Sequence, residues 1–160
     1  MNRMSKMIQM TDKIPFGKVF FRSKILGNVV PFTGTSSLSF EKIEPEEVII
    51  SLKNNRSVQN HIKQVHACAM GLVIETATGF VVGMNVPDDK ILLIKELNLK
   101  YVKRSSGKIK ATATLTQEQI EEIKKEPRGD ISVPVTLTDE ESKEPVKAEA
   151  IWAWREKKKD

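Results

Sequence analysis

The stretch that decides the fold reads NHIKQVHACAMGLVIETATGFVV and spans residues 60–82. From Val65 to Val82 almost every residue is apolar or small, and a helix that is apolar on every side is normally buried in a core. One carboxylate, Glu75, interrupts this run. Burying a carboxylate is costly unless it is paired, and burial also raises a carboxyl pKa toward a catalytic range. The stretch therefore predicts a buried central helix that carries a candidate functional group.

The bulk composition is that of a globular protein with one domain. The chain has 160 residues, of which 39% are hydrophobic, and this length can bury a sizeable core. The single cysteine, Cys68, excludes an intrachain disulfide and a zinc site built from several cysteines. No apolar run reaches the roughly 18 residues that span a bilayer, and residues 1–11 lack the apolar core of a secretion signal. We therefore expect a cytoplasmic protein that does not bind membranes.

The charge of the chain is mildly basic, at +5 near pH 7. This excess suits an anionic ligand without specifying one. Part of it lies in the tail at residues 155–160, and a short terminal charge run is typical of a solvated tail. The aromatic residues are few and are not interleaved with basic ones, so no nucleic-acid partner is expected.

The residues before the central stretch indicate a helix and then a hairpin. A helix is predicted over residues 15–27, with Gly27-Asn28 as its stop, and a loop over residues 31–37. One side of this helix carries Phe16, Val19, Phe20 and Ser23 and is expected to pack on the core, whereas Lys18, Arg22 and Lys24 are placed to reach water. Residues 38–52 read as a hairpin that turns at residues 44–46.

The second half of the chain is mostly strand. Alternating apolar residues predict strands at residues 91–102, 109–115, 131–137 and 146–154. Pro134 inside the third of these suggests an edge or a bulge. A short surface helix is expected at residues 116–126, where Thr116 and Gln119 form a capping-box pattern. One long apolar helix followed by consecutive antiparallel strands indicates the α+β class, with the helix packed on one face of the sheet.

This order of elements resembles the hotdog fold, in which an antiparallel sheet wraps around one long apolar helix. Asn60 precedes His66 by six residues and Glu75 follows it by nine, which resembles the Asn, His and Asp/Glu set of phenylacetate-type and 4-hydroxybenzoyl-CoA-type acyl-CoA thioesterases. Residues 95–108 resemble the next strand and turn of such enzymes. The resemblance covers residues 35–155 and implies a single hotdog domain at 1–160, with a helical extension at 1–34 and a basic tail at 156–160.

Two departures from the family pattern concern catalysis and substrate. Lys63-Gln64 stand where the family often has Gly-Thr, and Ala67 stands where a glycine often follows the histidine. Glycine lets a thioester oxygen approach the backbone closely, whereas alanine keeps the N–H donor but crowds it.

The resemblance implies an acyl-CoA thioesterase and gives each residue a role. Glu75 would activate water or attack the thioester, Asn60 would orient that water or carboxylate, and His66 would hold the loop or donate a hydrogen bond. The backbone N–H groups of Ala67 and Cys68 would polarise the thioester carbonyl. Coenzyme A is part of the substrate, and neither a separate cofactor nor a metal is expected.

The rest of the substrate would meet a basic turn and an apolar channel. A turn that carries basic residues suits the phosphates of coenzyme A. This turn comprises Lys103, Arg104, Ser105, Ser106, Gly107 and Lys108, with Lys110 close behind. The acyl chain is expected between helix and sheet, against Phe16, Phe20 and Phe32.

The spacing of His66 and Glu75 predicts a site shared by two chains. If both were helical, nine residues at about 100° each would place them on opposite faces, about 13–14 Å apart along the axis. One chain could hardly join them, whereas a partner helix alongside could, and related hotdog enzymes share their sites in this way. We therefore expect a homodimer or a dimer of dimers.

Other functions and simpler roles stay open at this point. A hotdog hydratase or dehydratase, or an acyl-CoA-binding protein without activity, would also fit the sequence. Glu75 would then pair with a lysine, Asn60 would anchor a loop, His66 would only hydrogen-bond the helix start, and Cys68 would fill the core. The basic turn would be a solvated hairpin, and His61 with His66 lacks a third metal ligand.

Overall fold

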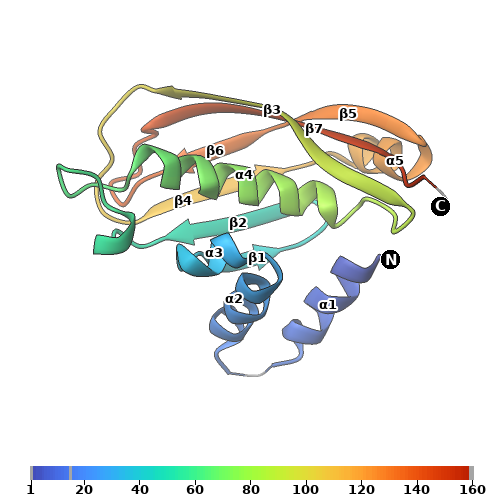
Figure 1. Ribbon diagram of the computed structural model, residues 1–160, viewed down its shortest axis with the longest axis horizontal. Coiled ribbons are helices and arrows are strands. Elements are labelled where there is room, and N and C mark those ends of the chain that lie inside the picture. Colours follow the sequence, from blue (N-terminus) through green and yellow to red (C-terminus); the bar gives the residue numbers. More distant parts are fainter. Residues whose placement is uncertain (1, 15, 159–160) are drawn as a thin grey trace.

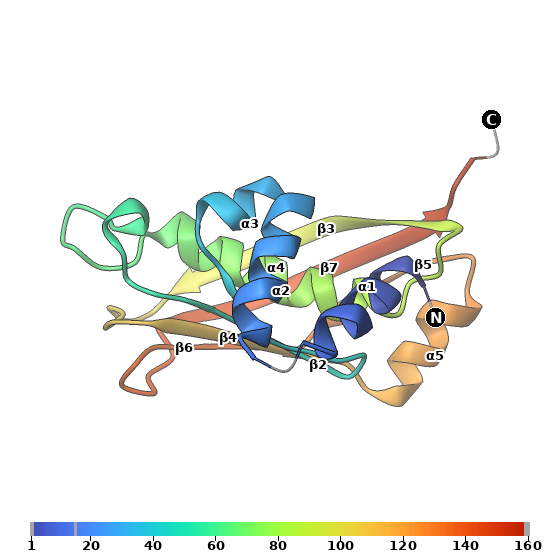
Figure 2. The same cartoon turned by 90° about the horizontal axis from the view of Figure 1, so that it is seen from below.

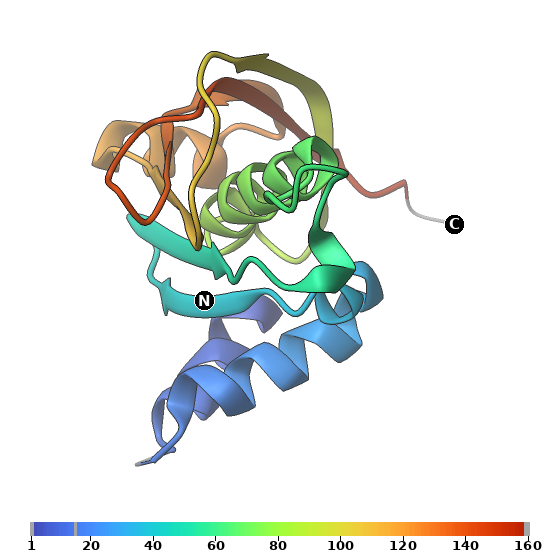
Figure 3. The same ribbon diagram turned by 90° about the vertical axis from the view of Figure 1, so that its left-hand side faces the viewer.

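A long apolar helix, α4 (Ala67–Gly83), lies at the centre of the molecule, and an antiparallel sheet curves around it (Figures 1 and 3). The computed structural model describes residues 2–14 and 16–158. Side chains of α4 such as Val73, Ile74 and Val81 have no exposed surface. The predicted central helix is therefore confirmed, although it begins two residues later than residue 65.

The sheet has seven strands, and every strand pair in it is antiparallel. The strands are β1 (Ser39–Ile43), β2 (Glu47–Leu52), β3 (Lys90–Tyr101), β4 (Ile109–Thr114), β5 (Arg128–Val133), β6 (Val135–Thr138) and β7 (Val146–Glu156). Their order is β1-β2-β4-β6-β7-β3, with β5 also paired to β7. The α+β class and the predicted hairpin of β1 and β2 are confirmed.

Pro134 divides the strand that was predicted over residues 131–137. β5 ends before it and pairs with β7, whereas β6 begins after it and pairs mainly with β4. Proline has no N–H to donate to a ladder, so the chain changes partners at this residue. The carbonyl of Pro134 still accepts a hydrogen bond from the N–H of Thr114 at 3.1 Å.

Two short helical segments lie between the longer elements. The predicted capping box opens α5 (Gln117–Lys125), since Thr116 and Gln119 exchange side-chain-to-backbone hydrogen bonds of 3.3 and 2.9 Å. A single 3-10 turn, η1 (Arg56–Val58), lies in the predicted loop before α4.

The N-terminal region differs most from the expectation. It forms three helices, α1 (Arg3–Asp12), α2 (Lys18–Val29) and α3 (Pro31–Thr35), which lie together on one side of the molecule (Figure 2). The prediction of a loop at residues 31–37 was therefore wrong over α3, and α1 was not predicted. Gly27 does not end α2, which runs on to Val29. It instead allows α2 and α3 to approach closely, since a Cβ at Gly27 would lie 2.8 Å from the Cα of Gly34. Pro15 lies outside the described residues.

The predicted sides of α2 are correct in part, since Lys18 and Lys24 are exposed as expected and Ser23 is half-buried. Arg22 is only 2% exposed, pairs with Asp12 and donates a hydrogen bond to the hydroxyl of Thr11. Phe16 and Phe20, which were expected on the core, are 88% and 61% exposed. The reason is that α1 supplies polar partners for Arg22, so this one basic residue of α2 faces the protein.

Candidate functional site

Glu75 lies in the middle of α4 and is half-buried. Burial raises its pKa above the ordinary value of 4.5, and the neighbouring hydroxyl of Thr76 has a smaller, opposite effect. Among the described residues Glu75 makes no ion pair, so the alternative of a lysine partner finds no support. An unpaired carboxyl group with a raised pKa is a candidate base or nucleophile.

The carboxyl group of Glu75 borders a slot of about 190 Å³. The walls come from the N-terminal helices on one side and from α4, β3 and β7 on the other. They comprise Met4, Met7, Leu26, Val29, Val30, Thr33, Glu75, Thr76, Gly79, Phe80, Leu92 and Trp152. We refer to these residues as the Glu75 slot. Phe16, Phe20 and Phe32, which were expected along the acyl chain, do not line it.

Asn60 anchors the loop before α4. Its Oδ1 accepts hydrogen bonds from the N–H groups of Ile62 and Gln64, at 3.0 and 3.1 Å. Within this loop Lys63 has a φ of 60°, in the left-handed region that favours glycine. The loop therefore keeps a backbone shape suited to glycine, although a lysine occupies the position.

His66 caps the N-terminus of α4 with its own ring. Its Nδ1 accepts a hydrogen bond from the N–H of Cys68 at 3.0 Å, which leaves the ring proton on Nε2 as a donor toward solvent. One of the two predicted amide donors is thus already used. The other, the N–H of Ala67, has no acceptor among the described residues. The expectation of a core cysteine was wrong, because Cys68 is exposed.

Tyr101 also belongs to this end of α4 and was not singled out from the sequence. Its hydroxyl donates a hydrogen bond of 2.8 Å to the carbonyl of Ala67. Burial and, to a smaller extent, the neighbouring Cys68 raise the pKa of Tyr101. Alternation along the strand placed Tyr101 on the same face as Leu99, but no local pattern indicated a contact with a residue 34 positions away.

The predicted basic turn is packed against acidic residues. Lys108 pairs with Glu41 at 2.5 Å, and the N–H of Ser106 donates to Asp139 at 2.9 Å. Gly107 has a φ of 60°, in the left-handed region that favours glycine, and its backbone lies against the side chain of Glu140.

The remaining residues of the turn differ in their accessibility. Ser105 is buried, whereas Lys103 and Arg104 are exposed and make no ion pair among the described residues. Because these two basic residues closely follow Tyr101, they lie at the same end of the molecule as the start of α4. They are the candidates of this turn that are free to bind a phosphate.

A single chain does not bring all these groups together. Asn60, His66, Ala67 and Tyr101 gather at the start of α4, whereas Glu75 lies nine residues further along. At a rise of about 1.5 Å per residue this separation is about 13 Å. The two halves of the predicted site therefore stand apart within one protomer.

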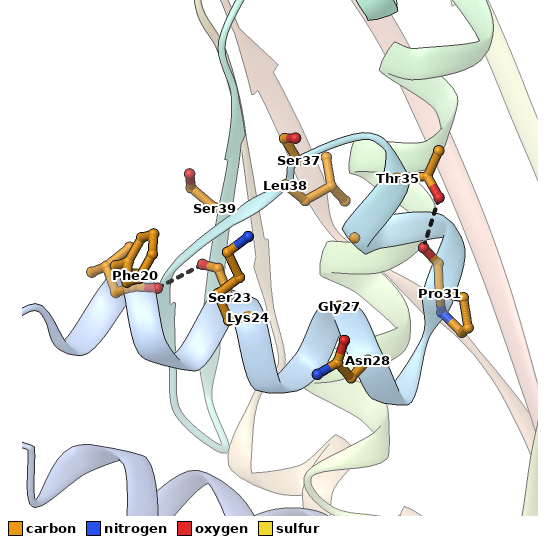
Figure 4. Close-up of a pocket in the computed structure, with 12 residues that line it drawn as sticks. Phe20, Ser23, Lys24, Gly27, Asn28, Pro31, Thr35, Ser37, Leu38 and Ser39 are labelled. Carbon is orange, nitrogen blue, oxygen red and sulfur yellow. Dashed lines mark hydrogen bonds between the residues drawn. The ribbon is translucent and has the colours of Figure 1, made fainter.

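A second hollow, of about 780 Å³, lies between α2, α3 and the start of β1 (Figure 4). Its lining includes Lys24 but no carboxylate, histidine or cysteine. It therefore lacks the pairing of a base with an orienting acid or nucleophile that is typical of hydrolytic sites. Within residues 2–14 and 16–158, no cluster of three or more His, Cys, Asp or Glu residues suits a metal ion, and no helix is long and apolar enough to cross a membrane.

Comparison with known proteins gives one family and several similar structures. A family model described as "Domain of unknown function (DUF4442)" matches residues 17–154, and no curated protein matches. A protein of unknown function from Pseudomonas aeruginosa, described as a probable thioesterase, has 22% identity and a TM-score of 0.76 over 84% of this chain and 93% of its own. A thioesterase from Haemophilus influenzae has 11% identity and a TM-score of 0.67 over 84% of this chain and 90% of its own. A mutant thioesterase from Staphylococcus aureus has 16% identity and a TM-score of 0.65 over 78% and 98%. These likenesses confirm the hotdog fold.

Proposed function

The chain belongs to the DUF4442 family and has the hotdog fold, and from this premise we propose that it hydrolyses acyl thioesters of coenzyme A. The observation that carries the proposal is Glu75, a half-buried carboxyl group with a raised pKa and no ion pair among the described residues, in the lining of a largely apolar slot. The thioesterase names of structural neighbours from Pseudomonas aeruginosa and Haemophilus influenzae support it.

The active unit is a homodimer, in which Glu75 of one chain faces the Asn60–Ala67 loop of the other. The separation of about 13 Å within one chain supports this arrangement. So does β3, a strand of 12 residues at the end of the sheet, on which Leu93 and Ile94 are exposed. A long apolar edge strand is normally paired or covered. Pairing two such edges would extend the sheet and bring the two α4 helices close.

In this site the thioester carbonyl accepts hydrogen bonds from the N–H of Ala67 and from Nε2 of His66. Both donors stabilise the negative charge that develops on the oxygen. Glu75 of the other chain takes a proton from water, and the water oxygen attacks the carbonyl carbon. The C–S bond then breaks, and the thiolate of coenzyme A takes up a proton. Direct attack by Glu75, with later hydrolysis of the anhydride, reaches the same products.

A second candidate, an acyl-CoA-binding protein without turnover, is favoured by one observation. The ring of His66 occupies the N–H of Cys68, so that amide is not available to a thioester oxygen. Only the N–H of Ala67 is left as a backbone donor, and an oxyanion site with one backbone donor fewer stabilises the negative charge less.

Thiol release over a panel of acyl-CoAs separates these functions, with wild type compared with Glu75→Gln and Asn60→Ala. We expect Glu75→Gln to lower kcat at least about a hundredfold while the circular dichroism spectrum is unchanged. Tight binding with no thiol release on any acyl chain would select the binding protein. Hydration of crotonyl-CoA without thiol release would select a hydratase.

A further inference from the structure

Met4 and Met7 of α1 form one side of the Glu75 slot, which we call its roof, and α4 forms the opposite wall. The helix α1 lies before residue 17, where the family match begins. Both methionines are half-buried and pack against the core. Because α1 was not predicted from the sequence, its contact with the slot was not predicted either.

Buried hydrogen bonds fix α1 to the end of α4. Asn2 accepts from the N–H of Ser5 through Oδ1, and its Nδ2 donates to the carbonyls of Gly83 and Val86 at 2.7 and 2.6 Å. The hydroxyl of Ser5 donates to the carbonyl of Met84 at 2.9 Å. These bonds satisfy carbonyl groups at the end of α4 that the helix itself cannot satisfy.

The position of the two methionines follows from this anchoring and from Arg22. A Cβ at Gly83 would lie 3.1 Å from the sulfur of Met4, so the methionine packs directly on the glycine. At the other end of α1, Arg22 of α2 binds Thr11 and Asp12. The roof is thus held at both ends.

The slot has the chemistry of a site for an amphiphilic molecule. Its lining is apolar apart from Glu75, Thr33 and Thr76. Glu75 is the ionisable group of this lining, and the apolar residues around it suit an aliphatic chain.

The opposite wall is rigid. The indole N–H of Trp152 donates to Thr78 at 2.9 Å, and a Cβ at Gly79 would lie 2.7 Å from the Trp152 ring. The ring therefore lies flush against α4 and has a fixed position. Methionine side chains, in contrast, are flexible and adapt to the shape of a ligand. The roof is the adjustable side of the slot.

We propose that the Glu75 slot holds the alkyl chain of the thioester, and that Met4 and Met7 of α1 set the length of chain that the protein accepts. The inference rests on the proposed function for the thioester end of the ligand. The slot is small, at about 190 Å³. We therefore expect aliphatic chains of short to medium length to be preferred over long ones.

The first test is the chain-length profile of kcat/KM from butyryl-CoA to palmitoyl-CoA. In the double variant Met4→Ala/Met7→Ala we expect a gain of about tenfold for long chains relative to hexanoyl-CoA, because two side chains leave the roof. Met10→Ala is the matched control, since Met10 is on the same helix but 72% exposed. An unchanged profile in a folded double variant would overturn the inference.

The second test measures binding and does not need turnover. Trp152 lines the slot, so ω-bromohexanol bound there should quench its fluorescence through contact with bromine. We expect saturable quenching in wild type and its loss in Trp152→Phe, with Trp154 still emitting. Quenching without thiol release on any acyl-CoA would uphold the slot and contradict only the proposed function. Thiol release without quenching would contradict the slot alone.

Discussion

At the scale of single residues, the proposed site depends on the burial of Glu75 and on the hydrogen-bond donors at the start of α4. The position of Glu75 in an apolar helix predicted its burial and the direction of its pKa shift, because one carboxylate in such a run has few polar neighbours. The cap by His66 and the bond from Tyr101 could not be predicted in the same way. Both depend on side-chain rotamers or on residues distant in sequence.

The stability of the protein should depend on pH through Glu75. Burial raises its pKa in the native state, so the stability that its protonated form contributes is fully present below the unfolded value of about 4.5 and is lost as pH rises through the native pKa. Glu75→Gln should therefore raise Tm near pH 7, and the gain should shrink near pH 4. Thermal melts at both pH values measure it, with the exposed Glu149→Gln as control. A lower Tm for Glu75→Gln near pH 7 would contradict the assignment.

The free amide of Ala67 can be removed without altering the helix. Ala67 is the first residue of α4, where proline is tolerated, and His66 before it has the extended backbone that a following proline requires. Ala67→Pro should lower kcat for thiol release at least about a hundredfold, because one oxyanion donor is lost. Gln117→Pro makes the same change at the first residue of α5 and should leave kcat unchanged. Equal effects of the two variants would remove this amide from the mechanism.

At the scale of elements, the strands, α4 and α2 were predictable, whereas α1 and α3 were not. Strands with alternating apolar residues and a helix that is apolar on every side both pack on one core, so the sequence pattern shows them directly. Their predicted bounds match those of the structure within a few residues. Arg22 was misplaced because its partners Thr11 and Asp12 lie on α1, a helix that was not predicted. A polar contact between two helices leaves no apolar pattern in either sequence.

The pairing of Arg22 with Asp12 should hold α1 on α2. Asp12→Ala would leave a buried guanidinium with only Thr11 as a partner and should lower the free energy of unfolding by about 2 kcal/mol. Lys18→Ala removes only the exposed partner of Asp12 and should cost less than about 1 kcal/mol. Urea titrations of the two variants give the comparison. Similar costs for both would show that the buried pair contributes little.

At the scale of the whole molecule, the fold was predictable from the sequence, but a single chain does not bring the two halves of the proposed site together. The order of one apolar helix and alternating strands was enough to predict the α+β class and the hotdog resemblance. A shift of register between Ile94 and Glu96 then changes which residues of β3 face outward. That bulge exposes Leu93, which alternation alone had placed with the inward residues Leu97 and Leu99.

The outer edge of β3 should be the dimer interface. Leu93 is 51% exposed there, and a lysine at an edge opposes pairing with another strand. Leu93→Lys should convert a homodimer to a monomer in sedimentation experiments and should lower thiol release with it. Phe16→Lys, at an exposed residue of the N-terminal region, should leave the mass unchanged. A dimer that survives Leu93→Lys with full activity would place the interface elsewhere.

The most direct test of the shared site is complementation between two inactive variants. Glu75→Gln and Ala67→Pro chains, unfolded and refolded together, form mixed dimers in which one of the two sites has both groups intact. Random pairing makes about half of the dimers mixed, and each mixed dimer has one intact site out of two. The mixture should therefore have about a quarter of the wild-type rate of thiol release. A mixture no more active than either variant alone would contradict a site built from two chains.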